Sequence, residues 1–407
     1  MNRNEKRREE IEIIVLIIYM LLMSGSVLNA VFSELFTINM LITGALTVYY
    51  ALRGELRRFR GRECVIFLFL CYLILNAITS MVWWNEWTYL QSYIANFSFF
   101  LMSFFISRKV NYHLFTRLYI NVVFAIAIIS LICFWQKDIL LILPSIELDN
   151  GVYKFYFIYN QLQSVVTRNC GIFWEPGMYQ GFLAMAVLFI QDKEKLNKAD
   201  VVKLIVLYTT IITTYSTTGY GVMILLIAMH IIRKVERKQL KFLLFIFGIF
   251  IALLIIFFGQ YIVLNLIDFF PDIVTEKIIN RETSFLTRQN SIIYDLIVSY
   301  NNPLGVGVTH LDEFLREIGR ARGLLLDANT NTIGKAFVYF GVLGGVAYTY
   351  IWISGIFRRN NGIISNIILL IIVMLIINTE PHLYTLFFNT IAFYWFSMEY
   401  EKSESGL

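Results

Sequence analysis

Apolar runs separated by short polar runs fill almost the whole of this sequence. Each run is about 17–25 residues long, the length of a helix that crosses the hydrocarbon region of a bilayer. The first run follows a charged segment and is longer than the apolar core of a signal peptide, so we interpret it as a retained helix. The pattern predicts about twelve transmembrane helices, near residues 11–31, 35–52, 64–83, 88–107, 118–136, 177–191, 202–215, 218–232, 242–265, 329–356, 363–378 and 383–398.

Basic residues gather on one side of this layout. Most of the 34 lysines and arginines lie in the N-terminal tail or in the connections after every second span, and the four short loops on the other side carry none. Basic loops stay in the cytoplasm. We therefore expect a multi-pass protein of a bacterial cytoplasmic (inner) membrane, with both termini in the cytoplasm and its active face periplasmic or extracellular.

Two connections on the outer side are unusually long, about 137–176 and 266–328. Loops longer than about 12–15 residues are usually functional or disordered, and these are too apolar to be disordered. The second contains two segments with apolar residues at helical spacing, 291–300 and 310–319. These amphipathic helices could lie on the membrane surface or fold over the bundle. The sequence thus predicts an all-α integral membrane protein of one domain, 1–407, whose two outer loops contain short helices.

Composition excludes several other classes. Of 407 residues, 58% are hydrophobic and 15% are charged, against roughly 45–50% and about 25% in soluble domains. The net charge of +5 follows from the membrane topology, so we expect no nucleic-acid partner. The four cysteines and four histidines are scattered without paired ligand spacing, so we expect no metal and no cofactor.

The preference of basic residues for the cytoplasmic side does not explain the arginines and lysines on the outer side. Arg168 and Arg288 have no acidic residue within four positions and are candidates for binding an anion; the alternative is an arginine that bonds loop carbonyls. Lys335 and Asn329 lie where the tenth span begins, facing outward. A helix N-terminus with a lysine suits a phosphate, although a cap with a snorkelling lysine explains the pattern too.

Two carboxylates precede prolines at predicted helix starts. Glu175 is expected at the N-cap of the sixth span, with Pro176 at the first helical position. Capping and the helix dipole alone could explain it; the functional alternative is a general base or a group that binds sugar hydroxyls. Glu380, before Pro381, is expected to repeat this arrangement at the twelfth span.

Four stretches resemble the O-antigen polymerase and ligase superfamily, the Wzy-type membrane glycosyltransferases. They are residues 168–177 (Arg-Asn-Cys-Gly-Ile-Phe-Trp-Glu-Pro-Gly), 216–221, 288–307 (ending Asn-Pro-Leu-Gly-Val-Gly) and 327–345 (containing Tyr-Phe-Gly-Val-Leu-Gly-Gly). The resemblance covers about the C-terminal 60% of the chain.

This resemblance implies transfer of a glycosyl chain from undecaprenyl diphosphate to the sugar of another lipid-linked oligosaccharide. Arg168, Arg288 and Lys335 would then stabilise the leaving diphosphate. Glu175, Asp327, Glu380 or His310 would accept the proton of the attacking hydroxyl. Besides the lipid-linked oligosaccharide and membrane lipid, a chain-length regulator protein is a candidate partner.

Two other functions stay open. A ligase of the same superfamily typically carries a histidine–asparagine pair before the late span, where this chain reads Asp327-Ala328-Asn329, so the polymerase is favoured. A flippase or transporter would place charges deep in the spans and show two related halves. Few such charges and no such halves are evident in the sequence.

Overall fold

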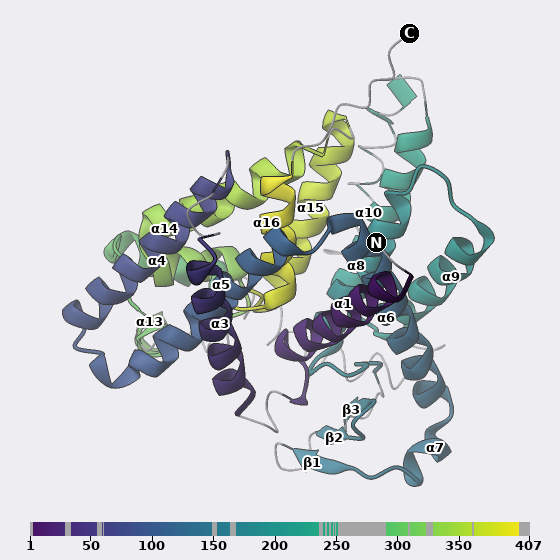
Figure 1. Cartoon of the computed structure of the whole chain (residues 1–407), viewed down its shortest axis with the longest axis horizontal. Helices are drawn as coiled ribbons and strands as arrows, with labels where there is room; N and C mark the ends of the chain where they lie inside the picture. The colour runs from purple at the N-terminus through teal and green to yellow at the C-terminus, as the bar shows by residue number, and fades with distance from the viewer. Residues whose placement is uncertain are drawn as a thin grey trace. The chain divides into compact units, whose positions relative to one another are not determined.

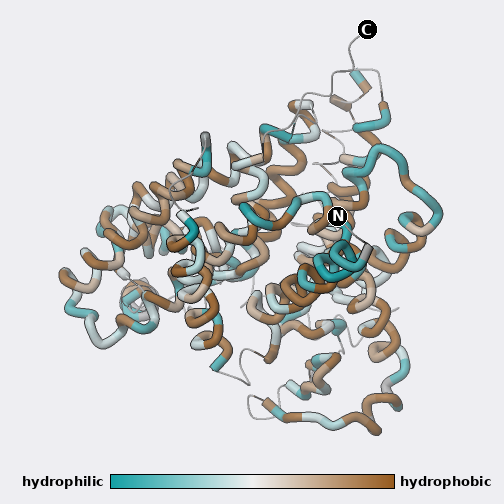
Figure 2. The backbone as a smooth tube through the Cα atoms, viewed as in Figure 1, coloured by the Kyte–Doolittle hydropathy of each residue, from teal (hydrophilic) through white to brown (hydrophobic). Residues whose placement is uncertain are grey.

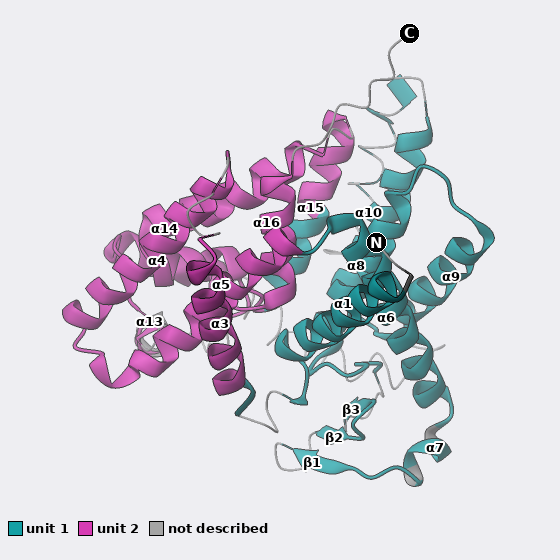
Figure 3. Cartoon of the chain, viewed as in Figure 1, with its two compact units in different colours: residues 1–35, 110–286, 372–380 teal, residues 36–109, 287–371, 381–407 magenta. Residues whose placement is uncertain are grey.

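The computed structural model describes residues 3–28, 34–54, 61–148, 153–162, 168–235, 290–307, 310–322, 329–359 and 362–398, with Phe59 and scattered positions between 239 and 250. This part of the chain is helical apart from one small sheet (Figure 1). The chain divides into two compact units, coloured separately in Figure 3. Unit 1 contains residues 1–35, 110–286 and 372–380, and unit 2 contains residues 36–109, 287–371 and 381–407.

Unit 1 is built around a helix that is buried on all sides. This helix is α8, which packs against α6, α9 and α10, and α1 packs against α6. The sequence of α8 is apolar around its whole circumference, as expected for a central helix. The bounds are α1 Arg3–Met23, α6 Tyr112–Trp135, α7 Lys137–Leu141, α8 Pro176–Gln191, α9 Lys198–Thr213 and α10 Thr217–Lys234.

Unit 2 is a second helical bundle. In it α5 packs against α16 and α4, and α14 packs against α16 and α4. The bounds are α3 Glu34–Leu52, α4 Glu63–Trp83, the 3-10 helix η2 Trp87–Tyr89, α5 Leu90–Lys109, α13 Leu311–Arg322, α14 Thr332–Phe357 and α16 Leu386–Ser397. The helix α15, Ile363–Thr379, is divided between the two units after Ile371. A further helix, over residues 290–301, precedes α13.

Five helices of the described residues are long and apolar enough to cross a membrane: Glu34–Leu52, Glu63–Trp83, Trp87–Lys109, Tyr112–Trp135 and Thr332–Phe357. Apolar residues dominate these helices in Figure 2. A helix lies at each predicted span except the one near 242–265, most of which falls outside the described residues. The first helix begins earlier than expected, at Arg3, because the Arg, Glu and Lys residues before the apolar run are good helix formers.

The first long loop differs from the expectation of helices alone. After the short helix α7 it contains a three-stranded antiparallel sheet in the order β1-β2-β3. The strands are Ile146–Leu148, Tyr153–Phe155 and Asn160–Leu162. Strands of three residues are too short to show a period, but the sequence Asn150-Gly151, between the first two strands, is typical of a hairpin turn.

Ion pairs join helix ends that the charge pattern assigns to the cytoplasm. In unit 1 Arg117 on α6 pairs with Glu10 on α1 at 2.6 Å, and Arg233 in the last turn of α10 pairs with Asp192 after α8 at 3.0 Å. In unit 2 the α5 residue Arg108 lies 3.3 Å from Glu63 at the start of α4.

Candidate functional site

The α14 helix of unit 2 is broken near its first third. Gly341 has a φ of 70° and a ψ of 178°, which no helix contains. The break exposes backbone carbonyls, and side chains of α4 satisfy one of them: the Tyr72 hydroxyl donates to the Phe340 carbonyl at 2.6 Å. Asn76 donates to the same oxygen at 3.4 Å.

A loop from the second long connection fits into this break. The Val306 N–H donates to the Val338 carbonyl at 2.9 Å, and the Val342 N–H donates to the Pro303 carbonyl at 2.8 Å. The approach requires glycine, because a Cβ on Gly305 would lie 2.5 Å from the Tyr339 carbonyl oxygen. Backbone hydrogen bonds thus join the described residues of the third and fourth stretches of the resemblance, 288–307 and 327–345.

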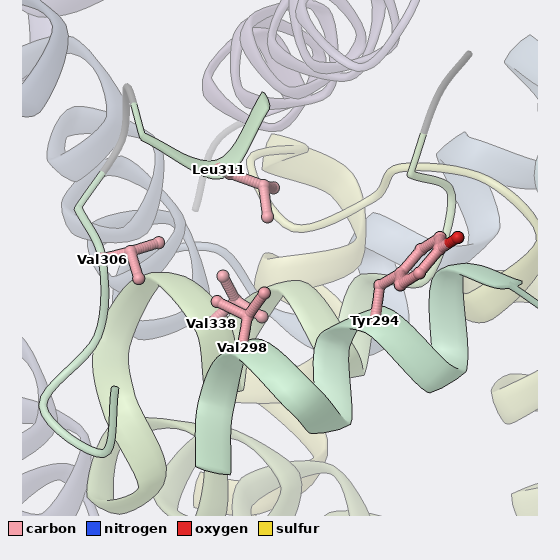
Figure 4. Close-up of a cluster of buried hydrophobic side chains, with 5 residues drawn as sticks. All are labelled: Tyr294, Val298, Val306, Leu311 and Val338. Atoms are coloured by element: carbon pink, nitrogen blue, oxygen red, sulfur yellow. The ribbon is translucent and has the colours of Figure 1, made fainter. Parts of the chain in front are cut away.

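An apolar cluster holds the two short helices of this connection on α14. Tyr294 and Val298 from the 290–301 helix meet Val306, Leu311 of α13 and Val338 of α14 (Figure 4). Trp84, Phe314 and Ile318 pack against the cluster. Both predicted loop helices are therefore confirmed, and they fold onto the bundle of unit 2.

A buried carboxyl group lies at the N-terminus of α14. Asp295, on the 290–301 helix, is 2% exposed. Its Oδ1 accepts a hydrogen bond of 2.5 Å from the Asn329 side-chain amide. Its Oδ2 lies against the α carbon of Gly334, where a Cβ would collide with it. Asn331 caps the helix by accepting from the Gly334 N–H at 3.1 Å.

Burial raises the pKa of Asp295 from 3.8 to about 7. The charged form is penalised by desolvation, which outweighs the opposing effects of the Asn329 amide, the Lys335 ammonium and the Asn331 amide. The carboxyl group therefore exchanges its proton close to neutral pH. Strongly perturbed groups of this kind gather at functional sites.

The structure thus brings two of the predicted site residues, Asn329 and Lys335, to a carboxylate that sequence analysis missed. The prediction of a helix around Asp295 rests on the apolar positions alone. Its polar positions, Ser291, Asp295 and Ser299, are spaced by four and share one face, which was the available signal. Arg288 and Asp327, which were also predicted, lie outside the described residues.

His310 lies in a second polar cluster of unit 2. Its Nε2 is 3.5 Å from Oε1 of the buried Glu86, and its Nδ1 is 3.1 Å from Oε2 of Glu313. Its ring lies 4.9 Å from that of Trp84, and the Tyr93 hydroxyl donates to Glu86. These contacts tie the start of α13 to the segment that follows α4.

Arg168 and Glu175 lie in unit 1. Arg168 donates from Nε to the Thr214 carbonyl at 3.2 Å and from a terminal nitrogen to the Tyr215 carbonyl at 3.3 Å. These are the loop-carbonyl bonds of the alternative interpretation, and they hold the turn between α9 and α10. Glu175 is exposed at the N-cap of α8 with Pro176 at the first position, as predicted, although its side chain makes no capping bond.

The expected position of Glu380 is wrong. The last helix begins at Leu386 with Thr385 as its N-cap, so Glu380 does not cap it. Instead Glu380 follows α15, is 4% exposed, and brings its carboxylate against Gly177 in the first turn of α8. The partial positive charge of that helix end favours a carboxylate there. The contact between Glu380 and the first turn of α8 therefore results from tertiary packing and not from the local sequence.

These features define a helical, membrane-embedded protein with a broken helix and a buried acid at its N-terminal end. Among the described residues no group of three or more histidine, cysteine or acidic side chains is arranged to hold a metal ion. Comparison of the chain with protein-family models, with curated proteins and with solved structures finds no match.

Proposed function

We propose that this protein is a polymerase that joins undecaprenyl-diphosphate-linked oligosaccharides into O-antigen or a related surface polysaccharide. It would cross the cytoplasmic membrane about twelve times, with both termini in the cytoplasm, and act on the outer face. The proposal rests on the four stretches of sequence described above and on the chemistry of the site in unit 2.

The buried Asp295 beside Lys335 is the observation that supports the proposal best. A general base works best with a pKa near the working pH, and burial gives Asp295 a pKa of about 7. Lys335, in the first turn of α14, carries a positive charge that can bind a diphosphate. One site can therefore both accept a proton and stabilise a leaving phosphate.

In the proposed reaction an acceptor hydroxyl attacks the anomeric carbon of the donor chain. The Asp295 carboxylate takes the hydroxyl proton as the new glycosidic bond forms. The bond from the anomeric carbon to the lipid diphosphate breaks, and that group leaves with the electron pair. Cations stabilise its growing charge; in unit 2 the structure describes Lys335 as a candidate, and Arg288, which lies outside the described residues, is a second candidate from the sequence. Glu175, Glu380, Asp327 and His310 remain alternative bases.

The test is the ladder of surface polysaccharide from a strain that lacks this gene. A polymerase defect leaves a single repeat unit on the cell-surface acceptor and no ladder. If long chains accumulate on the lipid carrier and never reach the acceptor, the protein is the ligase. Loss of all repeat units from the outer face, with accumulation inside, would instead indicate a flippase.

A further inference from the structure

We propose that residues 290–307 form a re-entrant element of the membrane. The segment enters the hydrocarbon region beside α14, turns at the break in that helix and returns to the side from which it entered. The face of its helix that points away from the bundle contacts lipid tails. This inference concerns the membrane itself and does not depend on the proposed function.

In the 290–301 helix the buried side combines polar residues with Tyr294 and Val298, and the exposed side is apolar or aromatic up to Asn301, which is exposed at the end of the helix. Ser291, Asp295 and Ser299 are buried, whereas Leu296 is 68% exposed and Tyr300 is 87% exposed. A helix at a water-facing surface shows the opposite arrangement. Hydrocarbon favours apolar side chains at the surface and confines polar ones to the interior.

The position of this segment along α14 gives its depth. Asp295 lies beside Gly334, near the start of α14, whereas Pro303 bonds to Val342 beyond the break. The rise of a helix is about 1.5 Å per residue, so Val342 lies roughly 15 Å along α14 from Thr332. For a helix that begins at the membrane surface, that is about half of a hydrocarbon core of roughly 30 Å.

A different helix gives a similar depth. Asn76 of α4 donates to the Leu304 carbonyl at 2.9 Å. It lies seven residues before the end of α4 at Trp83, roughly 10 Å along that helix. Since α4 runs toward the side from which α14 starts, both helices place the turn at 303–306 well below the outer surface.

The backbone of the turn meets the condition for non-helical chain at this depth. Such chain is tolerated in hydrocarbon only where its polar groups are bonded within the protein. Gly305 donates to the Asn302 carbonyl at 2.9 Å, and the Asn302 side chain donates to the Val298 carbonyl at 3.1 Å. Together with the two hydrogen bonds to α14 and the one from Asn76, these bonds connect the turn to itself, to α14 and to α4.

The exposed face of the segment resembles the exposed faces of the helices beside it. Leu304 is 69% exposed, as are Leu75 of α4 at 63% and Leu343 of α14 at 65%. Asp295 is the single charged residue between positions 290 and 307, and it points inward. A surface without charge, joined to helices of spanning length, fits lipid tails as its occupant.

Spin labels test this placement in the full-length protein. Nitroxides are attached to Leu296→Cys and Leu304→Cys after Cys64 and Cys71 are replaced by serine, and the protein is reconstituted into phosphatidylcholine vesicles. Collisions with oxygen, which concentrates in hydrocarbon, are compared with collisions with a water-soluble nickel chelate. Glu313→Cys on α13 is the matched control, because its side chain is 74% exposed and carries a charge in the native protein.

We expect the ratio of oxygen to nickel collisions to be several-fold higher at positions 296 and 304 than at 313. Nickel collisions as frequent at 296 and 304 as at 313 would place the segment in water and overturn the inference. Low collision rates with both reagents would mean that protein covers this face, which overturns it as well. Neither result would bear on the polymerase assay, so the two proposals fail separately.

Discussion

Asp295 combines deep burial with a bonded amide partner and a nearby ammonium group. Replacing it with asparagine keeps the shape and mimics the protonated form, so the variant should remain in the membrane at the normal level. If Asp295 is the base, polymer formation should fall by about 10²- to 10⁴-fold. The readout is the polysaccharide ladder in a complemented deletion strain. Glu194→Gln, on an exposed acid between α8 and α9, should leave the ladder unchanged; a normal ladder from Asp295→Asn would remove Asp295 from the chemistry.

The same carboxyl group should make stability depend on pH. Its pKa is 3.8 in an unfolded chain and about 7 here, so between these values the folded state binds more protons than the unfolded one. The free energy of unfolding should therefore fall as pH rises from 4 to 7 and level off above 7, by up to about 4 kcal/mol at 1.36 kcal/mol per pKa unit. Thermal unfolding in detergent from pH 4 to 8 should show a steeper slope for the native protein than for Asp295→Asn.

Substitutions of Arg168 test whether this arginine is structural or binds an anion. Two carbonyl bonds hold it on the turn after α9, and such charged hydrogen bonds stabilise by about 1.5–3 kcal/mol. Arg168→Ala should therefore lower the melting temperature, and Arg168→Lys should restore little of it, because a lysine cannot reproduce the guanidinium fork. An alanine variant that melts normally but makes no polymer would instead identify Arg168 as a substrate ligand.

At the scale of elements, the break in α14 depends on two glycines. Gly305 and Gly341 both have positive φ, and a Cβ on either would lie 2.5 Å from a backbone oxygen of the other segment. Gly305→Ala and Gly341→Ala should each destabilise the protein by more than the roughly 1–3 kcal/mol of the backbone strain alone. Gly362→Ala, with a φ of +80° and nothing within 4 Å, should show the effect of the backbone strain alone. Gly44→Ala, in the interior of α3 with nothing within 4 Å, should not destabilise the protein, because alanine favours a helix by about 1 kcal/mol over glycine. Equal melting temperatures for Gly341→Ala and Gly362→Ala would show that the close approach contributes nothing.

Helical periodicity predicts where the helices lie in the sequence better than it predicts what each helix face contacts. The segment 291–300 is a helix because Ile292, Ile293 and Leu296 recur at helical spacing. The same spacing does not tell whether the apolar face meets protein, water or lipid, so it did not reveal that Asp295 faces inward. The break at Gly341 was equally hidden, because an isolated glycine within a helical pattern is usually tolerated.

At the scale of the whole molecule, the charge pattern predicts a topology that reporter fusions can check. Alkaline phosphatase folds only outside the cytoplasm, so fusions after residue 150 and after residue 313 should be active. Fusions after residue 60 and after residue 195 should be inactive. A fluorescent protein fused at the same positions should give the reverse pattern. Activity after residue 195 would shift every later span by one crossing and exclude a twelve-span layout.

The sequence by itself determined the apolar, helical class of the protein and the positions of most helices, because the length and polarity of each run depend on nearby residues and on the solvent. It also identified Asn329 and Lys335 as neighbours of a helix N-terminus, because capping is local. The partners of Asp295 and Glu380 were decided by the tertiary structure. Asp295 meets Asn329, 34 positions away, and Glu380 meets the first turn of α8. Contacts over such separations arise from the packing of whole helices, and one sequence read along its length carries no signal for them.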